Sequence, residues 1–264
     1  MAHSLLAQLA MHAGDFATAV GHARAALPVM RRLGASDDEL QLHAALVQCA
    51  IADGRLADAR HELDRMDRID ERAAVFSGVI FRRTCQAELL LAEGETAAGL
   101  RLYRESAARM RELEWPGVVR TGREPWTLFG DAMALAAHAH YAAGEADAAF
   151  GDELYRTARD GALLVFGVED THLDYPAAGV LLFALGAWAL LHRAGPAQDA
   201  LRVLALAARF AYSQASPSMR WDRIAAAAEA AGAGLLARWQ EQYRDCPRPG
   251  LQLEARRAVE RLAG

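Results

Sequence analysis

Apolar residues recur along most of the chain at the spacing of α-helices, and a short motif that begins with glycine interrupts them. In each copy a second small residue follows the glycine by five positions. Glycine can take the left-handed conformation that ends a helix, and a small residue lets the next helix approach closely. The pattern therefore predicts a pair of antiparallel helices around each of five glycines: Gly14, Gly54, Gly94, Gly144 and Gly195.

The copies of the motif are 40, 40, 50 and 51 residues apart. A helix pair that recurs about every 40 residues is typical of repeat proteins that stack into a solenoid. We therefore expect an all-α fold in which residues 1–215 form a superhelical solenoid of about five antiparallel helix pairs. The position seven residues before the glycine is small or of modest size in four copies. In the fifth it is Trp188, which predicts altered packing in that pair.

The pattern changes after residue 215. Ser216 is a candidate N-cap and Pro217 suits the first position of a new helix. Further helices are expected near 235–243 and from Leu251. Residues 216–264 are therefore expected to form a C-terminal helical cap that packs on the solenoid as part of one continuous domain.

A connector that contains proline and glycine separates the third helix pair from the fourth, over residues 114–126. These residues prevent a continuous helix, and long loops in compact domains often carry function. The candidate contact residues of this loop are Trp115, Arg120, Arg123 and Trp126. The alternative is a packed connector whose tryptophan rings are buried.

The repeats resemble tetratricopeptide repeats over roughly residues 2–210, most closely in the Gly-Asp-Phe-x-x-Ala of residues 14–19. A narrower resemblance links the alanine-rich repeats, the tail Ser-Pro-Ser-Met-Arg-Trp-Asp-Arg-Ile of residues 216–224 and the Arg-Pro-Gly-Leu of residues 248–251 to one group of regulators. They are similar to the C-terminal sensor region of large actinobacterial transcriptional regulators of the antibiotic-regulatory, ATPase-containing type. Such regulators carry a DNA-binding domain, often with a nucleotide-binding domain, before the repeats. This chain contains neither, and it has no phosphate-binding Gly-x-x-x-x-Gly-Lys motif.

Composition narrows the function classes. All 29 basic residues are Arg, and the chain has no Lys or Asn, which with its many alanines indicates a genome of high GC content. The net charge of −5 disfavours direct contact with nucleic acid. Three widely spaced cysteines, the absence of a basic leader and a longest apolar run of only 15 residues (177–191) predict a cytoplasmic protein that does not enter a membrane.

Motifs of known catalytic sites are incomplete. His61-Glu62 begins like a zinc-protease helix, but Arg65 stands where the second histidine is required. The acidic cluster of residues 37–39 lies at an expected helix start, where carboxylates interact favourably with the positive end of the helix dipole. We expect no catalytic residues, no metal site and no cofactor, so that binding is the preferred function.

In tetratricopeptide-like stacks the first helix of each pair lines the concave surface. Positions six and three residues before each glycine share one face of that helix. They predict a partner-binding groove with a polar stripe beside an apolar stripe. The polar stripe is Gln8, Gln48, Glu88 and His138, and the apolar stripe is Met11, Ile51, Leu91 and Tyr141. The alternative is an ordinary solvated helix face.

The sequence thus predicts a protein–protein or ligand-sensing repeat module of a bacterial transcriptional regulator. Its partner would be a protein or peptide segment, which includes other domains of a larger regulator, or a small-molecule effector. Exposed terminal repeats could also pair two chains as a homodimer. The alternatives are a free-standing tetratricopeptide-like scaffold or adaptor, and an α-helical enzyme whose site the sequence does not reveal.

Overall fold

The computed structural model describes residues 2–69, 81–114, 124–167, 175–232 and 234–262. Within these ranges the chain forms thirteen α-helices and one short 3-10 helix, and no strand, which confirms the all-α class. None of the described helices is both long and apolar enough to cross a lipid bilayer. The contacts between residues divide the chain into two compact units.

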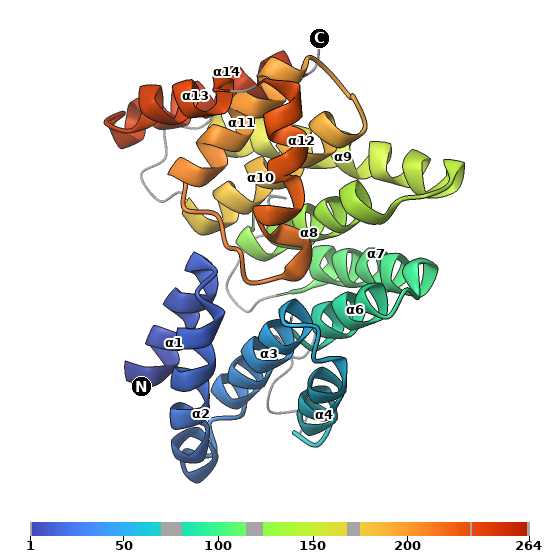
Figure 1. The fold of residues 1–264 in the computed structure, drawn as a ribbon, viewed down its shortest axis with the longest axis vertical. Coiled ribbons are helices and arrows are strands. Elements are labelled where there is room, and N and C mark those ends of the chain that lie inside the picture. Colours follow the sequence, from blue (N-terminus) through green and yellow to red (C-terminus); the bar gives the residue numbers. More distant parts are fainter. Residues whose placement is uncertain (1, 70–80, 115–123, 168–174, 233, 263–264) are drawn as a thin grey trace. The chain divides into compact units, whose positions relative to one another are not determined.

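Unit 1 comprises residues Met1–Met110 and Ser213–Arg220. Its α-helices are the blue to green ones in Figure 1, and residues Ser213–Arg220, much later in the sequence, add a 3-10 helix. They are α1 (Ala2–Ala13), α2 (Phe16–Leu33), α3 (Ser36–Ala52), α4 (Leu56–Met66), α6 (Arg83–Ala92), most of α7 (Thr96–Glu112) and the 3-10 helix η2 (Pro217–Met219).

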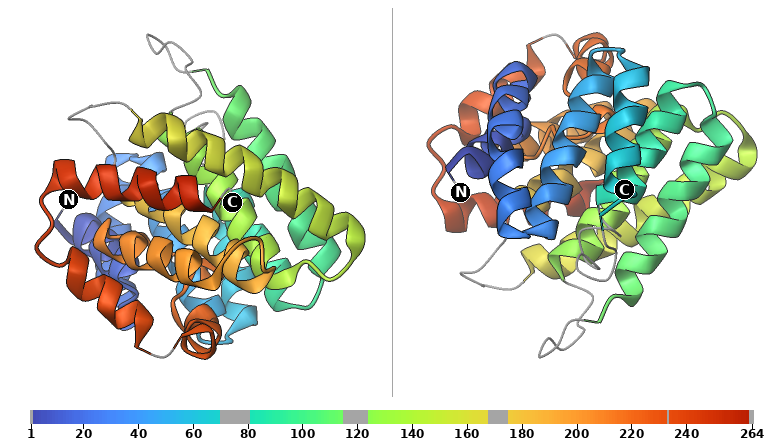
Figure 2. Two further views of the ribbon diagram at one scale, coloured as in Figure 1. Left: turned by 90° about the horizontal axis from the view of Figure 1, so that it is seen from above. Right: turned by 90° about the horizontal axis from the view of Figure 1, so that it is seen from below.

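Unit 2 comprises residues Arg111–Tyr212 and Trp221–Gly264. Its helices are α8 (Pro125–Tyr141), α9 (Glu145–Phe166), α10 (Tyr175–Leu191), α11 (Ala197–Arg209), α12 (Asp222–Ala231), α13 (Leu235–Tyr243) and α14 (Arg248–Arg261). Helix α10 is buried along almost its whole length and packs against α8 and α11, while α13 and α14 pack against α11 (Figure 2).

Each of the five motif glycines stands between two helices. Gly14, Gly54 and Gly94 adopt positive φ angles of 77°, 72° and 87°, as a left-handed helix end requires, and Gly195 has a φ of 134°. Gly144 is different, since its φ of −130° makes it the extended N-cap residue of α9. The predicted left-handed conformation is therefore wrong for the fourth copy.

The small residue five positions after the glycine has the predicted effect in unit 1. A Cβ atom on Gly99 of α7 would lie 2.7 Å from Cγ of Leu91 and 3.0 Å from the carbonyl oxygen of Ala87, both on α6. Only a residue without a side chain allows this approach, because real Cβ contacts are longer.

The fourth helix pair, α8 and α9, lies in unit 2, and its close packing involves a different small residue. Ala149 is exposed, whereas Gly151 lies directly under the ring of Trp188 from α10. A Cβ on Gly151 would be 2.0 Å from Cη2 of that ring, and the indole Nε1 donates to Oδ1 of Asp152 at 3.3 Å. Trp188 thus packs on α9 of the preceding pair, where glycine leaves room for its ring.

The segment from Ser213 to Arg220 belongs to unit 1, although the sequence placed residues from 216 onward in a C-terminal cap. Ser216 and Pro217 do not begin a full helix. Only the three-residue η2 forms, and the Ser216 side chain makes no capping hydrogen bond. The chain is extended again at Arg220, and α12 begins at Asp222.

Candidate functional site

Six of the eight predicted groove residues lie on three neighbouring helices of unit 1, and we call this surface the α1–α3–α6 face. Helix α3 contacts both α1 and α6. Five of the six side chains are buried, and only Gln8 is exposed, where it donates to the side-chain oxygen of Gln41. The six residues are Gln8 and Met11 on α1, Gln48 and Ile51 on α3, and Glu88 and Leu91 on α6.

The Ser213–Arg220 segment of the same chain covers part of this face. Helix η2 contacts α3, and Ala215 packs against the cluster that contains Met11 and Cys49. The main-chain N–H of Gln214 donates to the carbonyl oxygen of His12 at 3.2 Å, at the end of α1. At the other end of the segment the guanidinium of Arg220 lies 5.1 Å from the ring centre of Phe16, which is a cation–π contact.

Glu88 forms the polar centre of the face and is only 1% exposed. Its Oε1 accepts one hydrogen bond from the hydroxyl of Tyr103 at 2.7 Å and another from the main-chain N–H of Ser218 at 3.1 Å. A buried carboxylate is costly unless donors surround it. The segment therefore supplies one of the donors that this buried group needs.

Two polar atoms beside Glu88 are less well satisfied. Among the described residues, the side-chain oxygen of Gln48 and the hydroxyl of Ser218 are buried without a hydrogen-bond partner. The other end of the Gln48 amide donates to Sγ of Cys85 at 3.6 Å. Burial, and after it the charge of Glu88, raises the pKa of the Cys85 thiol, so this cysteine stays protonated.

The remaining two predicted groove residues lie in unit 2, on α8. His138 is fully buried, with Nδ1 2.7 Å from the carbonyl oxygen of Ala134 and its ring against Phe150. The hydroxyl of Tyr141 accepts from Arg223 at 2.7 Å, and the guanidinium lies 4.6 Å from the ring centre. These two residues thus belong to a different unit from the other six.

The predicted contact loop falls mostly outside the described residues, since Trp115, Arg120 and Arg123 are not among them. Trp126 is described and lies half-buried in the first turn of α8.

A charged cluster on α2, α3 and α4 is a feature that the sequence analysis missed. His43 is fully buried, and its Nδ1 lies 2.7 Å from Oε2 of Glu62, while its Nε2 lies 3.0 Å from Nη2 of Arg31. Arg31 also donates to Glu39 at 2.6 Å. The i, i+4 spacing of Glu39 and His43 was the available signal, but the partners on other helices were not visible in the sequence.

This cluster changes the acidity of Glu62. Burial opposes ionisation, but the hydrogen bond and charge of His43, together with the charges of Arg65 and His61, lower the pKa of Glu62. The carboxylate of Glu62 thus links α4 to α3 through His43, and His43 in turn contacts Arg31 of α2.

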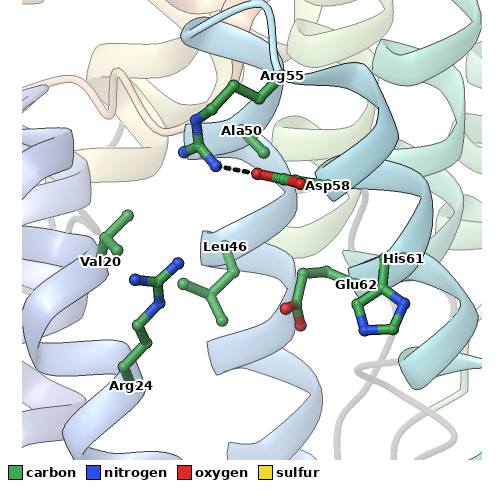
Figure 3. Close-up of a pocket in the computed structure, with 8 residues that line it drawn as sticks. All are labelled: Val20, Arg24, Leu46, Ala50, Arg55, Asp58, His61 and Glu62. Carbon is green, nitrogen blue, oxygen red and sulfur yellow. Dashed lines mark hydrogen bonds and ion pairs between the residues drawn. The ribbon is translucent and has the colours of Figure 1, made fainter.

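A pocket of about 210 Å³ opens beside this cluster (Figure 3). Figure 3 shows Arg24 of α2 on one side and His61 and Glu62 of α4 on the other, with Leu46 between them. Asp58 is already paired with Arg55 at 2.5 Å. The volume is below the roughly 300–1,000 Å³ of typical ligand sites, so the α1–α3–α6 face is the stronger candidate.

No group of three histidine, cysteine, aspartate or glutamate side chains with metal-binding geometry occurs in the described part of the chain. No protein-family model, curated protein or solved structure matches the chain.

Proposed function

We propose that the chain is a tetratricopeptide-like helical-repeat protein whose unit 1 binds an extended peptide segment on the α1–α3–α6 face. The recurrence of helix pairs at Gly14, Gly54 and Gly94 supports the superhelical arrangement, as do the left-handed conformations of these residues. The first helix of each pair supplies the face, as in stacks of this type.

One observation carries the proposal: the face already holds a stretch of chain that lies outside any α-helix. Five residues of the segment are buried, namely Ser213, Ser216, Pro217, Ser218 and Met219. Its main chain donates to Glu88 and to the end of α1. Main-chain hydrogen bonds supply affinity for a peptide, and flanking pockets for side chains supply specificity.

The segment also contains the start of the tail that resembles those of large bacterial transcriptional regulators. We therefore propose that the module senses a protein partner for such a regulator in the cytoplasm. A net charge of −5 favours a protein ligand over nucleic acid. A DNA-binding domain encoded upstream in the same gene would support the regulator, and its absence would favour a free-standing adaptor.

Mapping of a bound peptide tests this function. Peptides selected from a random display library against the full chain would be resynthesised with a photo-crosslinking residue and crosslinked to the protein. The expected crosslinks fall in residues 2–13, 36–52 and 83–92, which form the three helices of the face. Crosslinks confined to α2, α4 or unit 2 would contradict the proposal, as would a selection that recovers no binding peptide.

A further inference from the structure

We propose that the Ser213–Arg220 segment is a built-in competitor for the α1–α3–α6 face. The external ligand is then a peptide of the same chemistry in a separate protein: an uncharged, proline-containing stretch followed by arginine. This inference rests on the proposed function and names both its partner and its regulation.

The segment that occupies the face is nearly uncharged. The segment reads Ser-Gln-Ala-Ser-Pro-Ser-Met-Arg, with a single charge at its last position. That charge lies over the ring of Phe16, while the uncharged part enters the face and presents a main-chain N–H to Glu88. A ligand with a carboxylate next to Glu88 would be repelled, because like charges in a buried site are strongly unfavourable.

The occupant fits imperfectly, since the hydroxyl of its own Ser218 is buried and, within the described residues, without a hydrogen-bond partner. A peptide that buries no unsatisfied hydroxyl at this position would fit the face better than the chain's own segment does. An occupant that leaves polar atoms unsatisfied is one that a better ligand can displace.

The segment is attached outside any α-helix. It lies between the end of α11 at Arg209 and the start of α12 at Asp222, and its only regular element is the three-residue η2. The residues on both sides of it, Tyr212 and Trp221, belong to unit 2. Its release therefore breaks no hydrogen bond within an α-helix of either unit.

Attachment at both ends has a quantitative consequence. A tethered segment competes at a high effective concentration, of millimolar order for short linkers. The apparent Kd of an external peptide is the intrinsic Kd divided by the fraction of molecules whose face is open. Removal of the internal segment should therefore strengthen external binding without any new contact.

The probe is a fluorescent synthetic peptide with the sequence of residues 213–221, titrated by fluorescence anisotropy. The proteins are the full parent chain and an opened variant in which residues 213–220 are replaced by eight glycine and serine residues. The expected result is weak binding to the parent and at least about tenfold tighter binding to the opened variant. Adding Glu88→Ala to the opened variant should abolish binding, whereas adding Glu105→Ala, an exposed change on α7, should not.

A milder variant keeps the test decisive if the opened chain does not fold. Ser218→Pro removes the main-chain donor to Glu88, because proline has no N–H, and it also removes the Ser218 hydroxyl and disfavours the helical conformation of Pro217 in η2. In the full chain it should tighten binding of the peptide, and the same change in the peptide should weaken binding.

Three outcomes overturn the inference. The first is equal affinity of the probe for the parent and for a folded opened or Ser218→Pro variant. The second is a folded opened variant that does not bind the probe but still crosslinks library-derived peptides on α1, α3 and α6. That result would leave the proposed function intact. The third is a parent that dimerises by exchange of the segment, because the occupant is then a second copy of the chain. If the folded opened variant binds neither the probe nor the library-derived peptides, the proposed function itself is overturned.

Discussion

The carboxylate of Glu88 accepts a hydrogen bond from the main-chain N–H of Ser218, a residue 130 positions further along the chain, at 3.1 Å. The contact joins helix α6 of unit 1 to a segment whose neighbours in sequence belong to unit 2. It places inside the α1–α3–α6 face a carboxylate that is stable only when donors reach it.

Replacement of Glu88 by alanine should therefore lower the free energy of unfolding of unit 1. The change leaves the Ser218 N–H and the Tyr103 hydroxyl without this acceptor, at an expected cost of about 1–3 kcal/mol. Urea unfolding followed by circular dichroism measures the difference. The exposed Glu105→Ala is the matched control and should change stability by less than about 0.5 kcal/mol. Equal effects of the two substitutions would show that Glu88 has no special structural role.

Gly151→Ala should destabilise unit 2 through its contact with Trp188. A Cβ at this position would meet the ring at 2.0 Å, and the ring cannot move freely because it stacks on His192 and donates to Asp152. Overpacking of this kind costs about 1–3 kcal/mol. Thermal unfolding and the near-ultraviolet dichroism of tryptophan report the change.

Gly21→Ala is the control for this prediction. Gly21 lies inside α2, and a Cβ there would meet nothing within 4 Å. Alanine should stabilise that helix by roughly 0.5–1 kcal/mol, because it loses less conformational freedom on folding than glycine does. A stabilising Gly151→Ala would refute the account of the Trp188 packing.

The sequence predicted the helix pairs well because their signal is local. A glycine that ends one helix and a small residue in the next are both set by neighbouring residues, as at Gly94 and Gly99. The prediction failed at Gly144, where the helix restarts from an extended cap and the close contact shifts to Gly151. Trp188 signalled that change, but its partner on another helix could not be identified from spacing.

The site was less predictable because its parts come from distant positions. The position six residues before each motif glycine predicted that Glu88 and His138 share one groove. The motifs at Gly94 and Gly144 are 50 residues apart, however, and the division between the units falls at residue 110. Likewise Ser216-Pro217 has the local pattern of a helix start, but only η2 forms there, and the main-chain N–H of Ser218 donates to Glu88. No local rule predicts such a contact.

The stability contributed by Glu62 should depend on pH in a defined direction. Its pKa in the folded protein lies below the ordinary value of 4.5, because burial, the largest single effect, is outweighed by the combined hydrogen bond and charge of His43 and the charges of Arg65 and His61. The unfolded chain therefore takes up the proton first as the pH falls. The contribution is complete above the unfolded pKa and is lost as the pH falls through the folded pKa.

Glu62→Gln tests this dependence. The variant should be less stable than the parent at neutral pH, and the difference should shrink as unfolding is measured at successively lower pH. Other carboxyl groups titrate in both proteins, so their effects largely cancel in the comparison. A stability difference that stays constant through the acid range would contradict the assigned role of His43.

Arg202 should be the residue that most strongly holds α13 and α14 on α11. It is 8% exposed, donates to the hydroxyl of Tyr243 and to Glu254, and lies 4.7 Å from the ring centre of Trp239. Arg202→Ala should cost about 3 kcal/mol and expose the C-terminal helices to limited proteolysis. Arg257 pairs with the same Glu254 from an exposed position, so Arg257→Ala should cost less than about 1 kcal/mol. Similar losses from both substitutions would contradict this assignment.

The most direct test of the central claim is amide hydrogen exchange in the 213–220 segment, measured by mass spectrometry on the full chain. The N–H groups of Gln214, Ala215, Ser218, Met219 and Arg220 are all hydrogen-bonded, so the account predicts slow exchange of this segment in the parent. It also predicts faster exchange there in Glu88→Ala than in Glu105→Ala. Exchange in the parent at the rate of an unstructured peptide would contradict the claim that this segment occupies the α1–α3–α6 face.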